Sequence, residues 1–330
     1  MEQPKFYYKV VPMETEIVTE GENHGHYTRK IRYYICDEPE TGFKVHPAFV
    51  ENGNENDYIY LAAFEGSLWD ASASAYILDD AQVADFSADM LSSIAAVKPM
   101  SGLTQNLTRA NTRKLANNRG KGWEQAYAAT VAASQLLMLV EYASFNMQSA
   151  IGNGAVSKTD DTSSNMAEYT GATAELGIQI VSYRGEENFW GNIWGWVDGM
   201  NIQNPTPFDA AGKFGRLYVA DHGFADDTGN APYQDTGICP CYGEGYISAF
   251  GYSENFDWLF VPAEHNGSTA VPVGDYYWNY NAGWRVALLG GRWYSGLVSG
   301  AFCWGLHGAA SGRDRDVGGR SVYIPSKKAA

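Results

Sequence analysis

The stretch that decides the fold is WRVALLGGRWYSGLVSGAFCWGLHGAASGRDRDVGGRSVYIP, residues 284–325. Within it, Ala301–His307 is predicted to be a β-strand, in which successive side chains point to opposite faces. One face would carry three large apolar side chains, Phe302, Trp304 and Leu306. The other would carry Cys303, Gly305 and His307. Cys and Gly are poor choices for a stable outward strand position, which indicates that something other than stability selects this face.

The same contrast between a regular frame and arbitrary insertions runs through residues 284–325. Turn glycines, small residues and core aromatics form the frame, and its principal scaffold residues are Trp293, Phe302, Trp304, Gly319 and Arg320. Twelve other positions share no physical property: Arg292, Tyr294, Ser295, Leu297, Val298, Cys303, Gly305, His307, Gly308, Gly312, Asp314 and Asp316. We predict that these twelve form a ligand-binding face, with Tyr294 as its main anchor because aromatic side chains dominate such surfaces.

Residues 284–325 resemble the variable region of the target proteins of diversity-generating retroelements, which are found in phages and bacteria. In that family, reverse transcription randomises the adenines of chosen codons, typically asparagine codons. The resemblance implies a C-type-lectin-like fold whose last strands and loops present the randomised residues to a ligand. Randomising both adenines of an asparagine codon that ends in a pyrimidine cannot produce Lys, Glu, Gln, Met or Trp. None of the twelve positions carries one of these residues.

A second resemblance, to the formylglycine-generating-enzyme branch of the lectin-like fold, extends over roughly residues 120–320. Gly191–Trp196 (GNIWGW) is similar to the family's GNVWEW motif, and Leu288–Trp293 (LLGGRW) to its RGGSW motif. Gly319-Arg320 resembles the closing GFR, and Gln135–Ala143 the helix that ends in EWEYA. Catalytic members use a cysteine pair near the C-terminal end that has no counterpart here. The oxidase activity is therefore not carried over.

The chain is expected to adopt an α+β fold of C-type-lectin-like type, with antiparallel strands and two or more helices. Apolar residues at helical spacing predict helices over 81–95, 103–117 and 123–148. Aromatic and β-branched runs predict strands over 6–11, 28–35, 57–63, 215–220, 245–250, 257–261, 284–289 and 298–306. We divide the chain into a strand-rich segment, 1–65, and a lectin-like domain, 66–330, that contains the variable region.

The charge of the chain argues against nucleic-acid binding. Its formal net charge is −15, whereas phosphate binding needs a basic surface. No apolar run is long enough to cross a membrane, and the polar start Met1–Lys5 does not resemble a signal peptide. These features fit a phage virion protein that resides in the host cytoplasm before assembly.

Motifs for metal, cofactor or nucleophilic chemistry are weak. Cys239-Pro240-Cys241 is the one close cysteine pair, and His24-Gly25-His26 has no third ligand nearby. The loop motifs of calcium-dependent lectins do not occur, and Trp196 and Asp198 are interpreted as structural residues. We therefore expect no cofactor, no bound metal and no enzymatic activity.

The leading hypothesis is a hypervariable receptor-binding protein that recognises a protein or glycan on a cell surface. Such a protein would gain avidity from homo-oligomeric assembly in a virion, for example in a tail fibre. Two alternatives remain open at this point. One is a relative of the formylglycine-generating oxidases, and the other is a structural virion protein whose C-terminal region packs against its neighbours.

Overall fold

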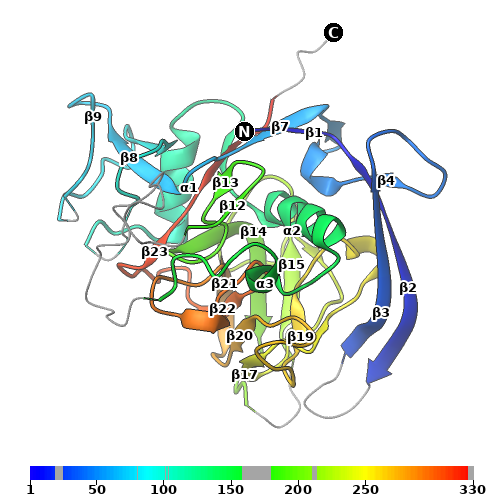
Figure 1. The fold of residues 1–330 in the computed structure, drawn as a ribbon. Coiled ribbons are helices and arrows are strands. Elements are labelled where there is room, and N and C mark those ends of the chain that lie inside the picture. Colours follow the sequence, from blue (N-terminus) through cyan, green and yellow to red (C-terminus); the bar gives the residue numbers. More distant parts are fainter. Residues whose placement is uncertain are drawn as a thin grey trace.

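A computed structural model describes residues 1–18, 25–79, 81–100, 102, 104–157, 180–209 and 214–325. The fold is mixed α+β, with mostly antiparallel strands and three α-helices among the described residues. Figure 1 shows the helices beside a central sheet and a long hairpin along one side of the molecule. The coarse fold class predicted from the sequence is therefore confirmed.

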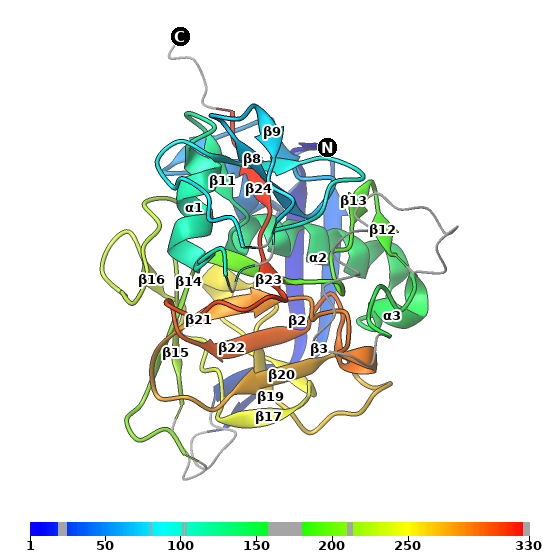
Figure 2. The ribbon, with the colours of Figure 1, turned by 90° about the vertical axis from the view of Figure 1, so that its left-hand side faces the viewer.

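The central sheet holds the C-terminal strands in its middle (Figure 2). Its strands, in spatial order, are β16 (Gln234–Asp235), β15 (Arg216–Val219), β14 (Trp194–Asn204), β21 (Gly283–Leu289), β22 (Trp304–Gly308), β20 (Tyr276–Asn279) and β17 (Gly243–Tyr246). The short strand β23 (Val317–Gly318) also pairs with β14, in parallel. The pair β20–β22 is parallel too, and the other pairs of this sheet are antiparallel.

A second sheet brings the two ends of the described chain together (Figure 1). Its order is β1 (Glu2–Pro4), β7 (Tyr58–Leu61), β24 (Ser321–Tyr323) and β11 (Trp123–Gln125). Strands from both sides of the proposed division at residue 65 thus share one sheet. The division itself stays a prediction.

The remaining strands form small sheets around this body. The long hairpin consists of β2 (Tyr7–Val18) and β3 (Gly25–Cys36), with β4 (Lys44–Val45) beside β2. Another three-stranded sheet contains β10 (Met90–Ser93), β8 (Gly66–Asp70) and β9 (Ala75–Tyr76). Three two-stranded ribbons complete the set: β5 (Val50–Glu51) with β6 (Asn54–Glu55), β12 (Ser182–Tyr183) with β13 (Glu186–Glu187), and β18 (Ala249–Phe250) with β19 (Pro262–Glu264).

The helices are shorter than the sequence predicts. The expected helix 123–148 is divided into strand β11, helix α2 (Ala128–Tyr142) and the single turn α3 (Met147–Ala150). Residues 123–125 pair with β24 instead of continuing the helix, and α2 ends at Ala143, whose left-handed φ is 50°. The expected helix 103–117 is confirmed only as α1 (Arg109–Asn117), which begins after its N-cap Thr108.

The helix expected over 81–95 is wrong. The carboxylates of Asp79 and Asp85 accept hydrogen bonds from backbone N–H groups two residues further along, which forms local turns. Aspartates compete with helix formation in this way. Met90–Ser93 then pairs with β8 as strand β10.

Most predicted strands are confirmed, and three are corrected. Residues 245–250 do not form one strand but are divided between β17 and β18, which belong to different sheets. Residues 257–261 form no strand, because they follow a 3-10 turn over Glu254–Phe256 and β19 starts only at Pro262. In the predicted strand 298–306, residues 296–298 form a 3-10 turn and β22 begins at Trp304. The segment between them is held by Asp275, whose Oδ2 accepts a 2.7 Å hydrogen bond from Phe302 N. The close approach requires glycine at 300, since a Cβ there would lie 2.0 Å from Asp275 Oδ1.

An aromatic cluster forms the centre of the core. The ring of Phe302 lies 5.4 Å from the rings of Phe145 and Phe260, and 5.6 Å from that of Phe250. Trp304 donates its indole N–H to the carbonyl of Phe260 at 2.8 Å. Both Phe302 and Trp304 are buried, which agrees with the predicted scaffold role.

A buried ion-pair network fastens α1 to the central sheet. Arg113 Nε lies 2.5 Å from Asp198 Oδ2, and Arg109 Nη2 lies 2.6 Å from Asp226 Oδ1. Arg113 also reaches Asp226, at 2.7 Å, and the side chains of Arg109 and Asp198 are fully buried. Asp198 is therefore a structural residue, as the sequence predicts.

Removing the Asp198 carboxylate leaves two guanidinium groups with one remaining counter-charge. We expect Asp198→Ala to lower the unfolding free energy by about 3–5 kcal/mol, the usual cost of breaking a buried ion pair. Urea unfolding followed by circular dichroism measures this loss of unfolding free energy. Glu14→Ala, which removes an exposed pair with Lys30, is the matched control and should leave the unfolding free energy unchanged. Equal effects of the two variants would contradict this view of the network.

Candidate functional site

An open cavity of about 300 Å³ lies over the middle of the central sheet. Strands β14, β21, β22 and β20, which supply much of its wall, run side by side in Figure 2. Its lining residues are Trp194, Trp196, Trp278, Tyr280, Leu288, Arg292, Ser295, His307, Gly308, Gly312, Arg313, Asp314, Asp316 and Val317. Its volume reaches the lower end of the range found for small-molecule sites.

Rigid aromatic side chains form the floor of the cavity. Trp194 and Trp196 alternate with Gly195 along β14, so both indoles lie on the same side of the sheet. Trp196 donates its N–H to the Leu107 carbonyl at 3.1 Å, and Trp194 meets Trp278 edge to face at 5.8 Å. These contacts fix the rings and give the cavity an apolar base.

Three of the predicted binding residues form one interlocked unit at the rim. Arg292 Nη1 lies 2.6 Å from Asp316 Oδ2, and the Tyr294 hydroxyl donates to the same oxygen at 3.0 Å. The Arg292 guanidinium also lies over the Tyr294 ring, 4.1 Å from its centroid. Asp316 is almost completely buried, and this burial raises the pKa of its carboxyl although Arg292 opposes the shift. Tyr294 therefore supports its neighbours and does not itself line the cavity.

The rest of the rim is polar and balanced in charge. The His307 ring stacks on Tyr280 at 4.9 Å, and burial lowers the pKa of its imidazole, which keeps the ring neutral at pH 7. Arg292 and Arg313 bring two positive charges, and Asp314 and Asp316 bring two negative ones. The lining as a whole is thus close to electrically neutral.

Seven of the twelve predicted positions line this cavity, namely 292, 295, 307, 308, 312, 314 and 316. Leu297 is 53% exposed and lies with the half-buried Val298 in the 3-10 turn Gly296–Val298, away from the lining. Seven positions that were chosen because their residue types share no physical property thus lie close together in space.

The prediction that Cys303 and Gly305 point outward is wrong. Cys303 is completely buried and packs in one cluster with Trp194 and Trp196, and burial raises the pKa of its thiol well above the usual range. Gly305 is buried as well, and a Cβ added at this position would lie 3.5 Å from the Cβ of Leu288. Cys303 is therefore buried among side chains of the same sheet, including Trp194 and Trp196 of β14, instead of facing solvent.

The other three predicted scaffold residues contact the body of the protein. Trp293 is completely buried against Ile193 and Ala155. Gly319 lies against Gly66, where its carbonyl accepts a 2.9 Å hydrogen bond from Gly66 N. Arg320 donates from Nη2 to the carbonyls of Glu187 and Asn188.

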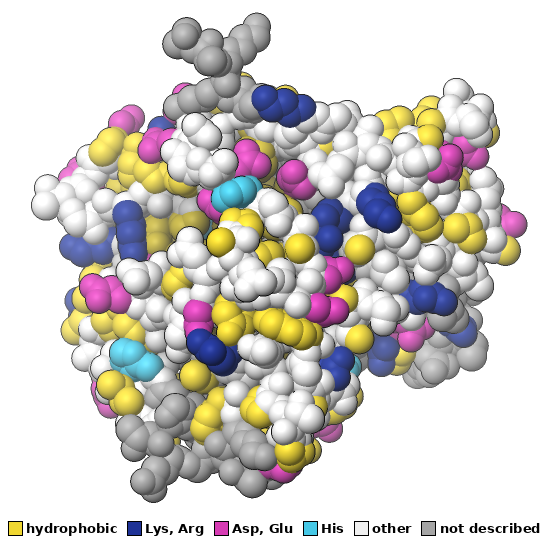
Figure 3. Space-filling model, turned by 180° about the vertical axis from the view of Figure 1, so that it is seen from behind, with side chains coloured by type: hydrophobic (Ala, Val, Ile, Leu, Met, Phe, Trp, Pro, Cys, Tyr) yellow, Lys and Arg dark blue, Asp and Glu magenta, His cyan; other side chains and the backbone are white. Residues whose placement is uncertain are grey.

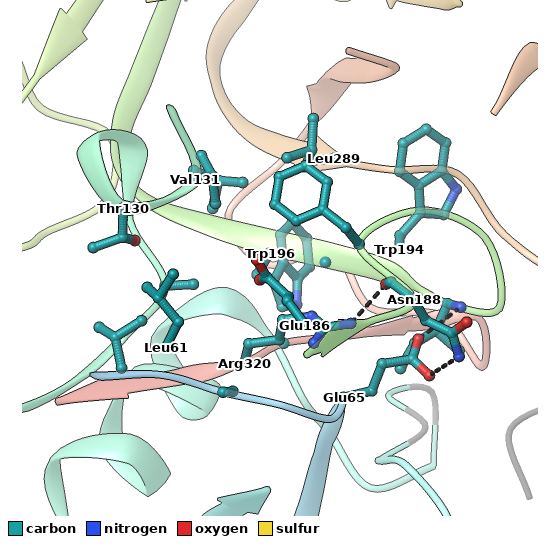
Figure 4. A pocket seen from close by; sticks show the side chains of 18 residues that line it. Leu61, Glu65, Thr130, Val131, Glu186, Asn188, Trp194, Trp196, Leu289 and Arg320 are labelled. Carbon is teal, nitrogen blue, oxygen red and sulfur yellow. Dashed lines mark hydrogen bonds between the residues drawn. The ribbon is translucent and has the colours of Figure 1, made fainter. Parts of the chain in front are cut away.

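A second, smaller cavity of about 40 Å³ is lined in part by Gly319 and Arg320. Figure 4 shows Glu65, Glu186 and Arg320 directed into it. Glu65 accepts hydrogen bonds from the side-chain amides of Asn188 and Asn192, which joins the start of β8 to the GNIWGW motif. The volume suits water more than an organic ligand, so we regard this cavity as structural.

Sequence reasoning missed part of the site. Trp278, Tyr280 and Arg313 line the open cavity but lay outside the predicted set. The aromatic run Tyr276–Tyr280 (YYWNY), with alternate residues on one face of β20, is the signal that could have found the first two.

No protein-family model and no curated protein matches this chain. Within the described ranges, no helix is long and apolar enough to cross a membrane. Among the same residues, no group of three or more His, Cys, Asp or Glu side chains is placed to hold a metal ion.

The buried Glu65 predicts a pH dependence of stability. Burial raises the pKa of its carboxyl from 4.5 to about 7, so the folded state keeps a proton that the unfolded chain loses near pH 4.5. The contribution of Glu65 is therefore fully present below pH 4.5 and is lost as pH rises through about 7. We expect the difference in unfolding free energy between wild type and Glu65→Gln to fall by roughly 3 kcal/mol between about pH 4 and pH 8.

Urea titrations of both proteins across this pH range provide the measurement. Because other groups titrate equally in the two proteins, the difference isolates Glu65. A difference that stays constant with pH, or rises, would show that this carboxyl is already ionised in the folded protein.

Proposed function

We propose that this protein binds ligands through the 300 Å³ cavity, whose rim residues are diversified by a retroelement-type mechanism. One observation carries the proposal. Seven of the twelve positions selected only because their residue types are arbitrary line a single cavity in the folded chain. An ordinary exposed strand edge would not gather such residues over an aromatic floor.

We also infer that the fold is of the C-type-lectin-like type, in its formylglycine-generating-enzyme branch. Support comes from the places of the quoted motifs. GNIWGW leads into β14, LLGGRW forms the end of β21 and its glycine turn, and Gly319-Arg320 precedes β24. The sharing of one sheet by the first and last strands agrees with this inference.

The cavity combines the two properties that a diversified binding site needs. Its aromatic floor is fixed by core contacts, so changes at the rim need not disturb folding. The rim residues Arg313 and Asp314 are exposed, and His307 and Ser295 are half-buried, so they can be replaced with little effect on packing. A cell-surface protein or glycan, met by a phage particle, is the partner that we propose.

The chemistry of the cysteines supports binding over catalysis. Cys303 and Cys241 are buried, and burial raises the pKa of Cys303, whereas a reactive cysteine needs an accessible thiolate. The charge pattern supports a partner other than nucleic acid. On the face shown in Figure 3, Lys and Arg side chains are interspersed with Asp and Glu and do not form a basic stripe.

Sequencing of the encoding locus across its source population tests the diversification. We expect substitutions at codons 292, 295, 307, 308, 312, 314 and 316, confined to positions that are adenines in a nearby template repeat next to a reverse-transcriptase gene. The codons for Trp194, Trp293, Phe302 and Trp304 should be constant, because these side chains are buried. Uniform codons at the rim and no template would reject this mechanism.

Display of the full chain tests the binding face directly. A library randomised at Ser295, His307, Gly312, Arg313 and Asp314 is expected to yield binders to an arbitrary protein target, with dissociation constants in the micromolar range or better. A matched library randomised at the exposed residues 37–41, which lie outside the cavity, is the control. Similar yields of binders from both libraries would show that the cavity has no special capacity for recognition.

A further inference from the structure

A different cavity, of about 400 Å³, lies between the sheet that holds both chain ends and the residues that follow α1. Residues of β7, β24 and β11 line it, together with Arg119 and Ser93. It shares no lining residue with the cavity assigned to diversified binding. Its role is therefore independent of the function proposed above.

The side chain of Arg119 is held in place but has no carboxylate partner among the residues that the structure describes. Its guanidinium lies 3.9 Å from the centroid of the Trp123 ring, and Nη1 donates to the Leu91 carbonyl at 3.1 Å. Nε is buried and has no hydrogen-bond partner among the described residues. By contrast, Arg29, Arg109 and Arg113 each pair with carboxylates. An unpaired guanidinium at a partly buried position is costly unless another group compensates it.

The surroundings of Arg119 favour an anion. None of the residues that line this cavity is an aspartate or a glutamate, although the chain carries 38 of them and a net charge of −15. A guanidinium that stacks on an indole presents its edge to a carboxylate and can bind it through two parallel hydrogen bonds.

An aromatic wall continues away from Arg119. The ring of Trp123 lies 5.1 Å from that of Tyr323, which in turn lies 5.9 Å from Tyr60. Leu61, Ala62 and Ala63 add apolar surface to the same cavity. This wall suits a flat, apolar group that is connected to the anion.

We propose that this cavity is a binding site for a small carboxylate with a flat apolar body. The carboxylate pairs with the Arg119 guanidinium, and the body lies against Trp123 and Tyr323. Binding supplies the counter-charge that the folded chain does not provide there, and the aromatic wall excludes water from the pair.

Isothermal titration of the full chain with benzoate, at low ionic strength, tests the proposal. We expect saturable binding of one benzoate, and binding of the uncharged analogue benzamide that is roughly tenfold weaker or undetectable. Inorganic phosphate, which has charge but no flat body, should not displace benzoate at equal concentration. No benzoate binding, equal binding of benzamide, or displacement by phosphate would each overturn the proposed ligand class.

Variants at position 119 connect the binding to this cavity. Arg119→Gln should weaken benzoate binding by about tenfold or more, whereas Arg119→Lys, which keeps the charge but loses the planar fork, should weaken it less. Arg216→Gln, at an exposed arginine that pairs with Asp235, is the matched control and should bind as wild type. Thermal unfolding confirms that each variant is folded. Unchanged binding by a folded Arg119→Gln would place benzoate elsewhere and overturn the proposal.

Discussion

The structure depends on one constraint, which is that residues 302–306 are buried on both sides of the chain. Phe302, Trp304 and Leu306 pack into the main core on one side. On the other, Cys303 packs in one cluster with Trp194 and Trp196. A strand enclosed in this way can tolerate few changes, because core substitutions create cavities or steric strain. Substitutions are better tolerated at the end of the strand and in the loops around it. These segments form part of the open cavity.

Part of the candidate site could be predicted from the sequence. Heterogeneous residues between glycine and aromatic positions can be recognised without coordinates, and seven of the twelve chosen positions line one cavity. The errors at Cys303 and Gly305 have a physical reason. Alternation along a strand reveals that there are two faces, but not whether distant side chains bury the outer one. Cys303 is buried among side chains that include Trp194 and Trp196, more than 100 residues earlier in the chain.

The errors in secondary structure arise from the same limitation. Residues 81–95 have helical spacing, yet their aspartates close local turns and Met90–Ser93 is recruited by β8. Residues 123–125 look like the start of a helix but pair with Ser321–Tyr323, almost 200 residues away. Local patterns give the preferences of a segment, and pairing with a distant strand overrides them when it buries more apolar surface. The α+β class was predictable because it depends on composition and order, not on such partners.

The interlocked unit of Arg292, Tyr294 and Asp316 has a consequence for how such a surface evolves. The side chains of Arg292 and Tyr294 both bind the same carboxylate oxygen of Asp316. A change at any of the three residues therefore alters what the other two contact. Their effects on stability and binding should be epistatic, because residues that share a partner do not contribute additively. Positions such as His307 and Asp314, which lie outside this unit, can be sampled one at a time. The number of functional residue combinations at the three positions is then smaller than the product of the residue types allowed at each position. Inheritance of the three residues as a set would preserve the contacts among them.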